Sequence, residues 1–413
     1  MEKYFANFHV SSNFSNFSLI NYKNNNYFHI ELKEIQNSIS FVNADTFLLW
    51  YREVIRIMHS TLKNKCELTV NIVFDDNLFN NLSHTVYLNT LKSSGIETNN
   101  IDNLEKLFNS RIQALKKSQI LEDLVTLQPI WYQTQNNQII KEYKQIPQNK
   151  KFDTLSQYLS VFKTDYSSIE IKHLKDILFS LKSKAKLNVY VKSQITAMDF
   201  YASDNETLVV DLNWNYLTLY VVKNGTVLTY EKINKGIANF VNFVSQKYKL
   251  DKKCVLNMMR YEALEQDSNA ETYPNDKTYQ DIIAQYQNFK QQILSYINSY
   301  YQTKCLKSAF INKLESLAFS GELAWMIKDL EVAYSEKANF IKLNLVKTNE
   351  EDNFTLFALE DKIIEKVTIV TNKLITEINL NNTIASRIDY THEKSQKTFF
   401  TRIFKHLIMR SQK

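Results

Sequence analysis

The chain has 413 residues, of which 44% are hydrophobic, and a formal net charge of +6 at pH 7. This length suffices for two or three domains with filled cores. No apolar run approaches the roughly 18 residues that span a bilayer, and the first residues lack a signal peptide's apolar core. The three cysteines are scattered and the seven histidines show no metal-ligand spacing. We therefore predict a cytoplasmic protein with no disulfide framework and no metal site.

The first half of the chain alternates between strand and helix patterns. The predicted elements are strands at 5–20, 27–32, 68–74, 155–163 and 187–191, with helices at 46–62 and 169–181. The segments at 5–20 and 27–32 predict a pair of strands, and Asp45 is placed to cap the first helix. Residues 76–153 interrupt this pattern, because they are polar and rich in Asn and Gln around one predicted helix at 103–121.

The strongest local pattern predicts a set of three strands at 208–212, 217–222 and 226–232. The last two flank Asn224-Gly225, and Asn-Gly between alternating strands predicts a tight hairpin. The elements predicted beyond it are helices at 238–248, 252–264, 279–301 and 322–333, strands at 314–319 and 340–345, and a helix and strand within 354–380. Strands interrupted by helices in two halves predict an α/β fold.

Residues 394–413 carry a charge of +6, which equals the net charge of the whole chain. Apolar residues recur there at helical spacing, and basic residues lie on the other sides. This pattern is typical of a helix that lies in a membrane interface, where each basic residue adds roughly 1 kcal/mol near anionic lipid. The predicted membrane-binding residues are Phe399, Phe400, Arg402, Ile403, Phe404, Lys405, Leu407, Ile408 and Arg410. Docking on the protein's own body and nucleic-acid binding are the alternatives.

The run 208–236 resembles the second phosphate segment of actin-like ATPases, and of the FtsA family in particular. In that family an aspartate ends a strand, a glycine-rich turn leads into a hairpin, and a further glycine precedes a helix. The matching stretch here begins at Asp211, and Gly225 and Gly236 fall on the later turn positions. Gly321 matches the turn that holds the adenosine. Three of the four glycines in the chain therefore lie at family turn positions.

The resemblance implies an α/β, two-lobed actin-like (ribonuclease-H-like) fold with an FtsA-type inserted subdomain and a C-terminal amphipathic helix. The implied divisions are 1–75 and 154–206 for the first lobe, 76–153 for the inserted subdomain, 207–236 and 313–380 for the second lobe, 237–312 for a helical subdomain, 381–396 for a linker and 397–413 for a membrane-targeting helix.

By the same resemblance, the nucleotide-binding residues are Asp211, Asn213, Asn215, Gly236 and Gly321. The family's three turn glycines are replaced here by Asn213, Trp214 and Asn215, whose side chains obstruct the approach of a phosphate to the backbone. The family's first phosphate motif falls at 10–14, which has neither its acid nor its glycine. We therefore expect little or no ATP hydrolysis, no catalytic residue and no required cofactor. Binding of ATP with Mg²⁺ is left open.

The resemblance further implies a membrane adaptor that tethers FtsZ filaments to the inner face of the cell membrane during cell division, as part of the divisome. The C-terminal peptide of FtsZ would bind the 237–312 region, and the tail would bind an anionic membrane surface. Self-association into filaments would add avidity. One alternative is an active actin-like ATPase of the pilus-assembly or shape-determining type. Another is a nucleic-acid-binding protein that uses the basic tail, but we expect no nucleic-acid partner because the rest of the chain is nearly neutral.

Overall fold

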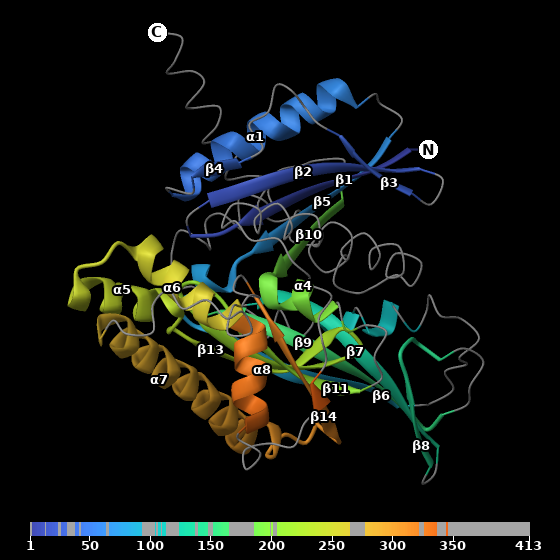
Figure 1. Cartoon of the computed structure of the whole chain (residues 1–413). Coiled ribbons are helices and arrows are strands. Elements are labelled where there is room, and N and C mark those ends of the chain that lie inside the picture. Colours follow the sequence, from blue (N-terminus) through green and yellow to red (C-terminus); the bar gives the residue numbers. More distant parts are fainter. Residues whose placement is uncertain are drawn as a thin grey trace.

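The computed structural model describes residues 2–345, with gaps of which the longest are 93–103, 113–123, 165–185 and 265–276. Within these residues the strands form three sheets with helices packed on them (Figure 1). The helix predicted at 169–181, the elements within 354–380, the linker and the predicted membrane-binding residues all lie outside the described residues. None of the described helices is both long and apolar enough to cross a membrane.

The first sheet has the strand order β10-β5-β1-β2-β3, with β4 also paired to β2. Its strands are β1 (Glu2–Val10), β2 (Phe14–Lys23), β3 (Asn26–Ile30), β4 (Ser38–Ser40), β5 (Cys66–Phe74) and β10 (Lys186–Val191). β1, β5 and β10 run parallel, whereas β2 runs antiparallel to β1 and to β3. The prediction of one strand over 5–20 was wrong, because the chain reverses between Val10 and Phe14 and forms two strands.

Helix α1 (Ala44–Thr61) lies across the outer face of this sheet (Figure 1) and buries its apolar side chains against it. Its cap is Asn43, whose Oδ1 accepts a hydrogen bond of 2.8 Å from the backbone N–H of Thr46. The prediction that Asp45 caps this helix was wrong. Asp45 is the second residue of the helix, where its negative charge is still favourable near the positive end of the helix dipole.

The second sheet repeats the topology of the first, with the order β13-β12-β11-β14-β15. Its strands are β11 (Glu206–Leu212), β12 (Leu217–Lys223), β13 (Thr226–Ile233), β14 (Leu314–Ser320) and β15 (Asn344–Leu345). β11, β14 and β15 run parallel, whereas β12 runs antiparallel to β11 and to β13. Each lobe is thus an antiparallel three-strand meander extended by two parallel strands. This confirms the predicted α/β, two-lobed actin-like fold.

Four helices accompany the second sheet, namely α5 (Ile237–Tyr248), α6 (Lys252–Leu264), α7 (Lys277–Tyr300) and α8 (Ile327–Glu336). The two predictions at 252–264 and 279–301 agree closely with α6 and α7, which is followed by the short π-helix η2 (Tyr301–Cys305). α8 agrees with the later part of the helix predicted at 322–333, whose residues 322–325 lie outside the described residues. Apolar residues of these helices form one core with one face of the second sheet.

A third sheet is inserted between β5 and β10 and has the order β6-β9-β7-β8. Its strands are β6 (Leu82–Lys92), β7 (Leu124–Asn136), β8 (Ile139–Tyr143) and β9 (Thr154–Thr164), and the short helix η1 (Asp76–Leu78) precedes it. We call these four strands the inserted sheet. The boundary predicted at residue 153 was wrong for β9, which pairs along its length with β6 and β7 rather than with the first-lobe sheet.

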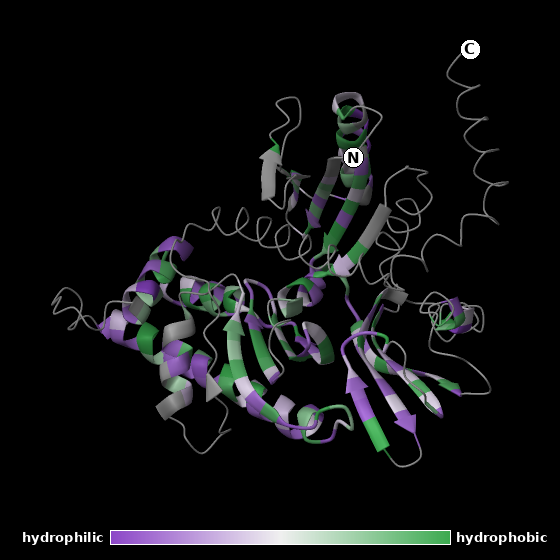
Figure 2. Cartoon of the chain, turned by 90° about the vertical axis from the view of Figure 1, so that its right-hand side faces the viewer, coloured by the Kyte–Doolittle hydropathy of each residue, from purple (hydrophilic) through white to green (hydrophobic). Residues whose placement is uncertain are grey.

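The second sheet is buried on both faces, and all seven residues of β11 are buried. Leu208 and Val210 face the core made with the helices, whereas Val209 faces the core shared with the first lobe and the inserted sheet. Figure 2 shows hydrophobic and hydrophilic residues interspersed along the strands and around the helices. The second sheet therefore packs against apolar residues on both faces, which fits the largely hydrophobic sequences of β11 and β12.

Candidate functional site

The carboxyl ends of parallel strands from both lobes meet between the two sheets. β5 ends at Phe74 and β10 at Val191 in the first lobe, while β11 ends at Leu212 and β14 at Ser320 in the second. In open α/β sheets this edge is where ligands bind, because it gathers loops and helix starts from several strands. The space between these strand ends is therefore the candidate functional site.

Polar residues at and just beyond these strand ends, together with Tyr230 and Lys232 of β13, form what we call the interlobe cluster. Its members are Asp75, Asp76, Lys192, Ser193, Asp211, Asn213, Tyr216, Tyr230 and Lys232. All of them are buried except Lys232, which is half-buried. Asp75 and Asp76 directly follow β5, and Lys192 and Ser193 open the short helix α4 (Lys192–Met198) directly after β10.

Hydrogen bonds join the two lobes through this cluster. The Tyr216 hydroxyl donates to Asp75 Oδ1 at 2.6 Å, and the Tyr230 hydroxyl donates to Asp76 Oδ2 at 3.0 Å. Lys232 Nζ donates to the backbone carbonyl of Asp76 at 3.2 Å and also to that of Phe79. In each case the donor belongs to the second lobe and the acceptor to the segment that follows β5. The chain's own side chains therefore bridge the space between the sheets.

The carboxyl group of Asp76 has an unusual electrostatic environment. Burial, together with the charges of Asp75 and Asp211, raises its pKa to about 7, whereas the N–H of Ser193, which donates to Oδ1 at 3.3 Å, opposes the shift. A buried carboxyl that titrates near neutral pH is typical of functional sites and of structural polar networks alike. Tyr230, whose pKa burial and Asp76 raise well above its usual value, stays protonated as the donor.

Histidine and lysine side chains complete the electrostatics of the cluster. Burial lowers the pKa of His9 on β1 to about 4, with Lys192 also lowering it and Asp75 opposing, so this imidazole is neutral at pH 7. Burial also lowers the pKa of Lys232, against the pull of Asp76 and Asp75. Lys192 Nζ donates to Asn213 Oδ1, and it lies 5.9 Å from the centre of the Tyr216 ring.

The turn at 213–216 packs onto the start of α5 and occupies its first amide groups. The backbone N–H of Ala238 donates to the carbonyl of Trp214 at 2.8 Å, and that of Ile237 donates to the carbonyl of Asn213 at 3.4 Å. A phosphate at a helix start needs these N–H groups. A β-carbon at Gly236 would collide with the backbone of Asn213, Trp214 and Tyr216, so this glycine permits close backbone packing. The residues present therefore do not fit a phosphate at this turn.

Gly321, at the end of β14, is packed against the end of β11. Its φ of +115° favours glycine, and a β-carbon there would also collide with the Leu212 carbonyl and Asp211 Oδ1. The Asp211 carboxylate in turn accepts a hydrogen bond of 3.1 Å from Asn213 Nδ2. Because Gly321 has no side chain, the ends of β11 and β14 can approach each other closely beside the buried Asp211 carboxylate.

The structure brings together four of the five predicted nucleotide-binding residues, namely Asp211, Asn213, Gly236 and Gly321. Asn215 lies in the same turn with its side chain exposed. Sequence reasoning missed Asp75, Asp76, Lys192 and the two tyrosines. A signal was present for the first three, because each directly follows a predicted strand. Within the part of the chain that the structure describes, no group of three His, Cys, Asp or Glu residues is arranged to hold a metal ion.

No family model matches this chain, and no curated protein matches it. Solved structures similar to it include MreB5 of Spiroplasma citri bound to ADP, with 8% identity, a TM-score of 0.44, and coverage of 92% of this chain and 99% of that chain. A PilM-PilN type IV pilus biogenesis complex has 9% identity and a TM-score of 0.41, over 93% of this chain and 98% of that chain.

A third similar structure is a protein from Bacteroides thetaiotaomicron with an actin-like ATPase fold and unknown function. It has 11% identity and a TM-score of 0.33, over 89% of this chain and 95% of that chain. The solved structures found to be similar thus include a protein described as having an actin-like ATPase fold. These low identities and scores carry no conclusion about activity.

Proposed function

We propose that this protein is an actin-fold adaptor that does not turn over ATP and that tethers FtsZ filaments to the cytoplasmic face of the cell membrane. The observation that carries the proposal is the 213–216 turn, whose carbonyls take the N–H groups of Ile237 and Ala238 that a phosphate would need. An actin-like fold whose phosphate turn is filled by its own backbone is suited to holding partners in place rather than to a hydrolytic cycle.

The membrane part of the proposal rests on the tail sequence. One amphipathic helix binds lipid reversibly, so protomers sharing a filament would attach far more strongly than single ones. The test is co-sedimentation with vesicles containing anionic phospholipid, comparing the full chain with a form lacking residues 394–413. We expect only the full chain to sediment with the vesicles. Equal binding by both forms would contradict the membrane anchor.

Two substitutions in the tail refine this test. Phe404→Ser removes an apolar contact and should weaken vesicle binding at every ionic strength, whereas Arg410→Gln should weaken it mainly at low salt. Thr401→Ser is the matched control and should bind as the parent does. Binding to duplex DNA that falls steeply with salt, in place of vesicle binding, would instead support the nucleic-acid alternative.

The FtsZ part of the proposal places the binding surface in the 237–312 region, which contains α5, α6 and α7. The test is a pull-down of purified FtsZ and of FtsZ lacking its C-terminal peptide on the immobilised full chain. We expect retention of the complete FtsZ only. Equal retention of both forms, or of neither, would count against the adaptor function.

The second candidate function is an active actin-like ATPase of the pilus-assembly or shape-determining type. It is favoured by one observation, the gathering of Asp75, Asp76 and Asp211 near the strand ends where Mg²⁺-nucleotides bind in such folds. Calorimetric titration with ATP and Mg²⁺ separates the two candidates. The adaptor should show weak binding or none, and a steady-state phosphate-release assay should stay at background. Tight binding lost in Asp211→Ala would favour the ATPase.

A further inference from the structure

The inserted sheet contacts the second lobe closely, although its strands lie between two strands of the first lobe in the chain. β13 is the edge strand of the second sheet, and it lies close to β6 of the inserted sheet. Among the described residues, side chains join the inserted sheet to the β12–β13 hairpin at three places.

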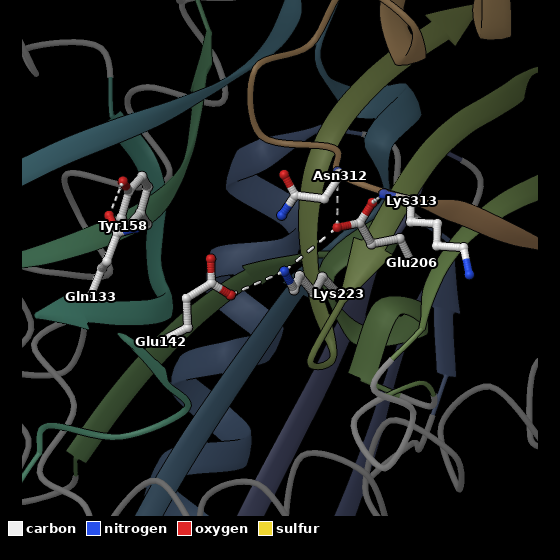
Figure 3. A network of polar contacts seen from close by, with 7 residues as sticks. All are labelled: Gln133, Glu142, Tyr158, Glu206, Lys223, Asn312 and Lys313. Carbon is white, nitrogen blue, oxygen red and sulfur yellow. Dashed lines mark hydrogen bonds and ion pairs between the residues drawn. The ribbon is translucent and has the colours of Figure 1, made fainter. Parts of the chain in front are cut away.

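The first contact lies at the turn of the hairpin. Lys223, the last residue of β12, places its Nζ 4.8 Å from the centre of the Trp131 ring on β7 and 3.5 Å from Glu142 Oε2 on β8. The positive φ values of Asn224 and Gly225 make the tight turn that follows it. Lys223 also lies 3.5 Å from Glu206 Oε1 at the start of β11 (Figure 3).

Both ends of this contact are fixed within their own sheets. The Glu206 carboxylate accepts hydrogen bonds from the backbone N–H groups of Asn312 at 3.2 Å and Lys313 at 2.9 Å, which holds it in the second lobe (Figure 3). On the other side Trp131 stacks on Tyr158, with ring centres 4.6 Å apart. Tyr158 packs edge-to-face with Phe310 of the second lobe, with ring centres 6.2 Å apart. Lysine and aromatic rings thus form one layer that crosses between the sheets.

The second and third contacts follow β13 toward the first lobe. The half-buried His84 of β6 lies 2.8 Å from Ser160 Oγ through Nε2 and hydrogen-bonds the backbone of Val227 on β13. Burial lowers the pKa of His84 to about 3, so the ring is neutral and each nitrogen has one role. Further along, Phe162 packs against the Tyr230 ring at 5.2 Å, and Tyr230 bonds Asp76 at the junction of the first lobe and the inserted sheet.

We propose that the inserted sheet is a brace that holds the two actin-like sheets at a fixed angle, with the β12–β13 hairpin as its attachment to the second lobe. It is joined to the first lobe through the chain and to the second lobe through the three contacts. Rotation of one lobe against the other must slide β13 along β6 and separate Lys223 from Trp131. Hinge closure of the kind that ligands drive in two-lobed proteins is therefore opposed. The inference holds whether or not the protein binds FtsZ or a membrane.

The test measures the distance between the lobes in the full chain. Spin labels are attached through unnatural azido side chains at Glu53 on α1 and at Lys307 after η2, which are both exposed, so the native cysteines stay in place. The parent should show one narrow distance distribution by double electron–electron resonance. Lys223→Met combined with Phe310→Ala removes the lysine charge and the second-lobe ring from the layer. We expect a broadened distribution or a second population.

A matched control exists on α5, where Lys247 Nζ lies 5.7 Å from the centre of the Phe243 ring within one helix. Lys247→Met combined with Phe243→Ala makes the same chemical changes away from the inserted sheet and should leave the distribution narrow. A folded test variant with the parent's distribution, or equal broadening in the control, would overturn the brace. If near-ultraviolet circular dichroism shows the double variant unfolded, Lys223→Met alone decides by the same criterion, since methionine keeps an apolar stem over Trp131.

Discussion

Tyr216 of the second lobe donates a hydrogen bond of 2.6 Å to the carboxylate of Asp75 in the first lobe. Both side chains are buried, and the same carboxylate oxygen accepts the backbone N–H of Asn77 at 2.9 Å. The carboxylate of Asp75 is thus oriented by a backbone N–H of the following turn, and Tyr216, which directly precedes β12, donates to it from the second lobe. This hydrogen bond therefore links the two lobes at the carboxyl end of β5.

Removing this one hydroxyl should weaken the association of the lobes. Tyr216→Phe keeps the ring but leaves Asp75 short of a donor, and hydrogen bonds to charged groups contribute about 1.5–3 kcal/mol. We expect the free energy of unfolding in urea to fall by that amount. Tyr296→Phe, a half-buried tyrosine on α7, is the control and should change it little. Equal losses of free energy of unfolding in the two variants would show that the hydrogen bond between Tyr216 and Asp75 does not stabilise the association of the lobes.

Asp76 should make the stability of the protein depend on pH. Its pKa is raised to about 7 in the folded protein against 3.8 as its ordinary value, so between these pH values the folded state holds a proton that the unfolded state releases. The free energy of unfolding therefore falls as pH rises through this range, by at most about 1.4 kcal/mol per pH unit. The stabilisation is complete below pH 3.8 and is lost as pH rises through 7.

Asp76→Asn should abolish this component, because the amide does not titrate. His9 and His84, whose lowered pKa values are about 4 and 3, act in the opposite direction below pH 6.5 in both proteins. The difference between parent and variant, measured by urea unfolding at several pH values from 5 to 8, therefore isolates Asp76. We expect the variant to gain relative stability as pH rises. A constant difference across the series would show that Asp76 does not titrate there.

Local patterns predicted the second lobe better than the rest of the molecule. The Asn224-Gly225 hairpin, the strands around it and α6 depend on residues close in the chain, and each was recognisable from alternation or helical spacing. In the inserted sheet, β9 was predicted as a strand at 155–163 but assigned to the first lobe, and the other strands were not recognised. Residues of β6 alternate irregularly between buried and exposed, and β8 is largely exposed, because one sheet serves both a small core of its own and the contact with β13.

The interlobe cluster was out of reach for a different reason. Tyr216 and Asp75 are 141 positions apart, and Tyr230 and Asp76 are 154 apart. Only the folded arrangement brings such residues together. What the sequence did show was an Asp-Asp pair after one strand and a lysine after another, and the parallel-sheet rule could have placed these at a common edge. The glycines were informative because a β-carbon at Gly236 or Gly321 would collide with neighbouring parts of the chain, so these two positions require glycine.

The helix cap that sequence reasoning misplaced can be tested directly. Asn43→Ala removes the acceptor for the Thr46 N–H and should lower the free energy of unfolding by about 1 kcal/mol. Asn43→Ser keeps an acceptor oxygen at the cap and should cost much less. Asp45→Ala removes only a favourable charge near the helix start, worth about 0.3–1 kcal/mol. A larger loss from Asp45→Ala than from Asn43→Ala would return the cap to Asp45.

Gly236→Ala tests whether the 213–216 turn is packed as tightly onto α5 as the structure shows. The added methyl group would meet the backbone of Asn213, Trp214 and Tyr216, which cannot move aside as a flexible side chain could. Overpacking of this kind costs about 1–3 kcal/mol, measured as the loss in free energy of unfolding in urea. Gly225→Asn is the matched control, since asparagine tolerates the positive φ of 70° at that turn, and it should cost less.

Hydrogen exchange adds a local readout, because displacement of the turn exposes the Ala238 N–H. Faster exchange at Ala238 in Gly236→Ala alone would show that the turn, and not the helix as a whole, closes the start of α5. Unchanged stability and exchange would mean that the turn has room to move, and the main argument against phosphate binding at this position would fail.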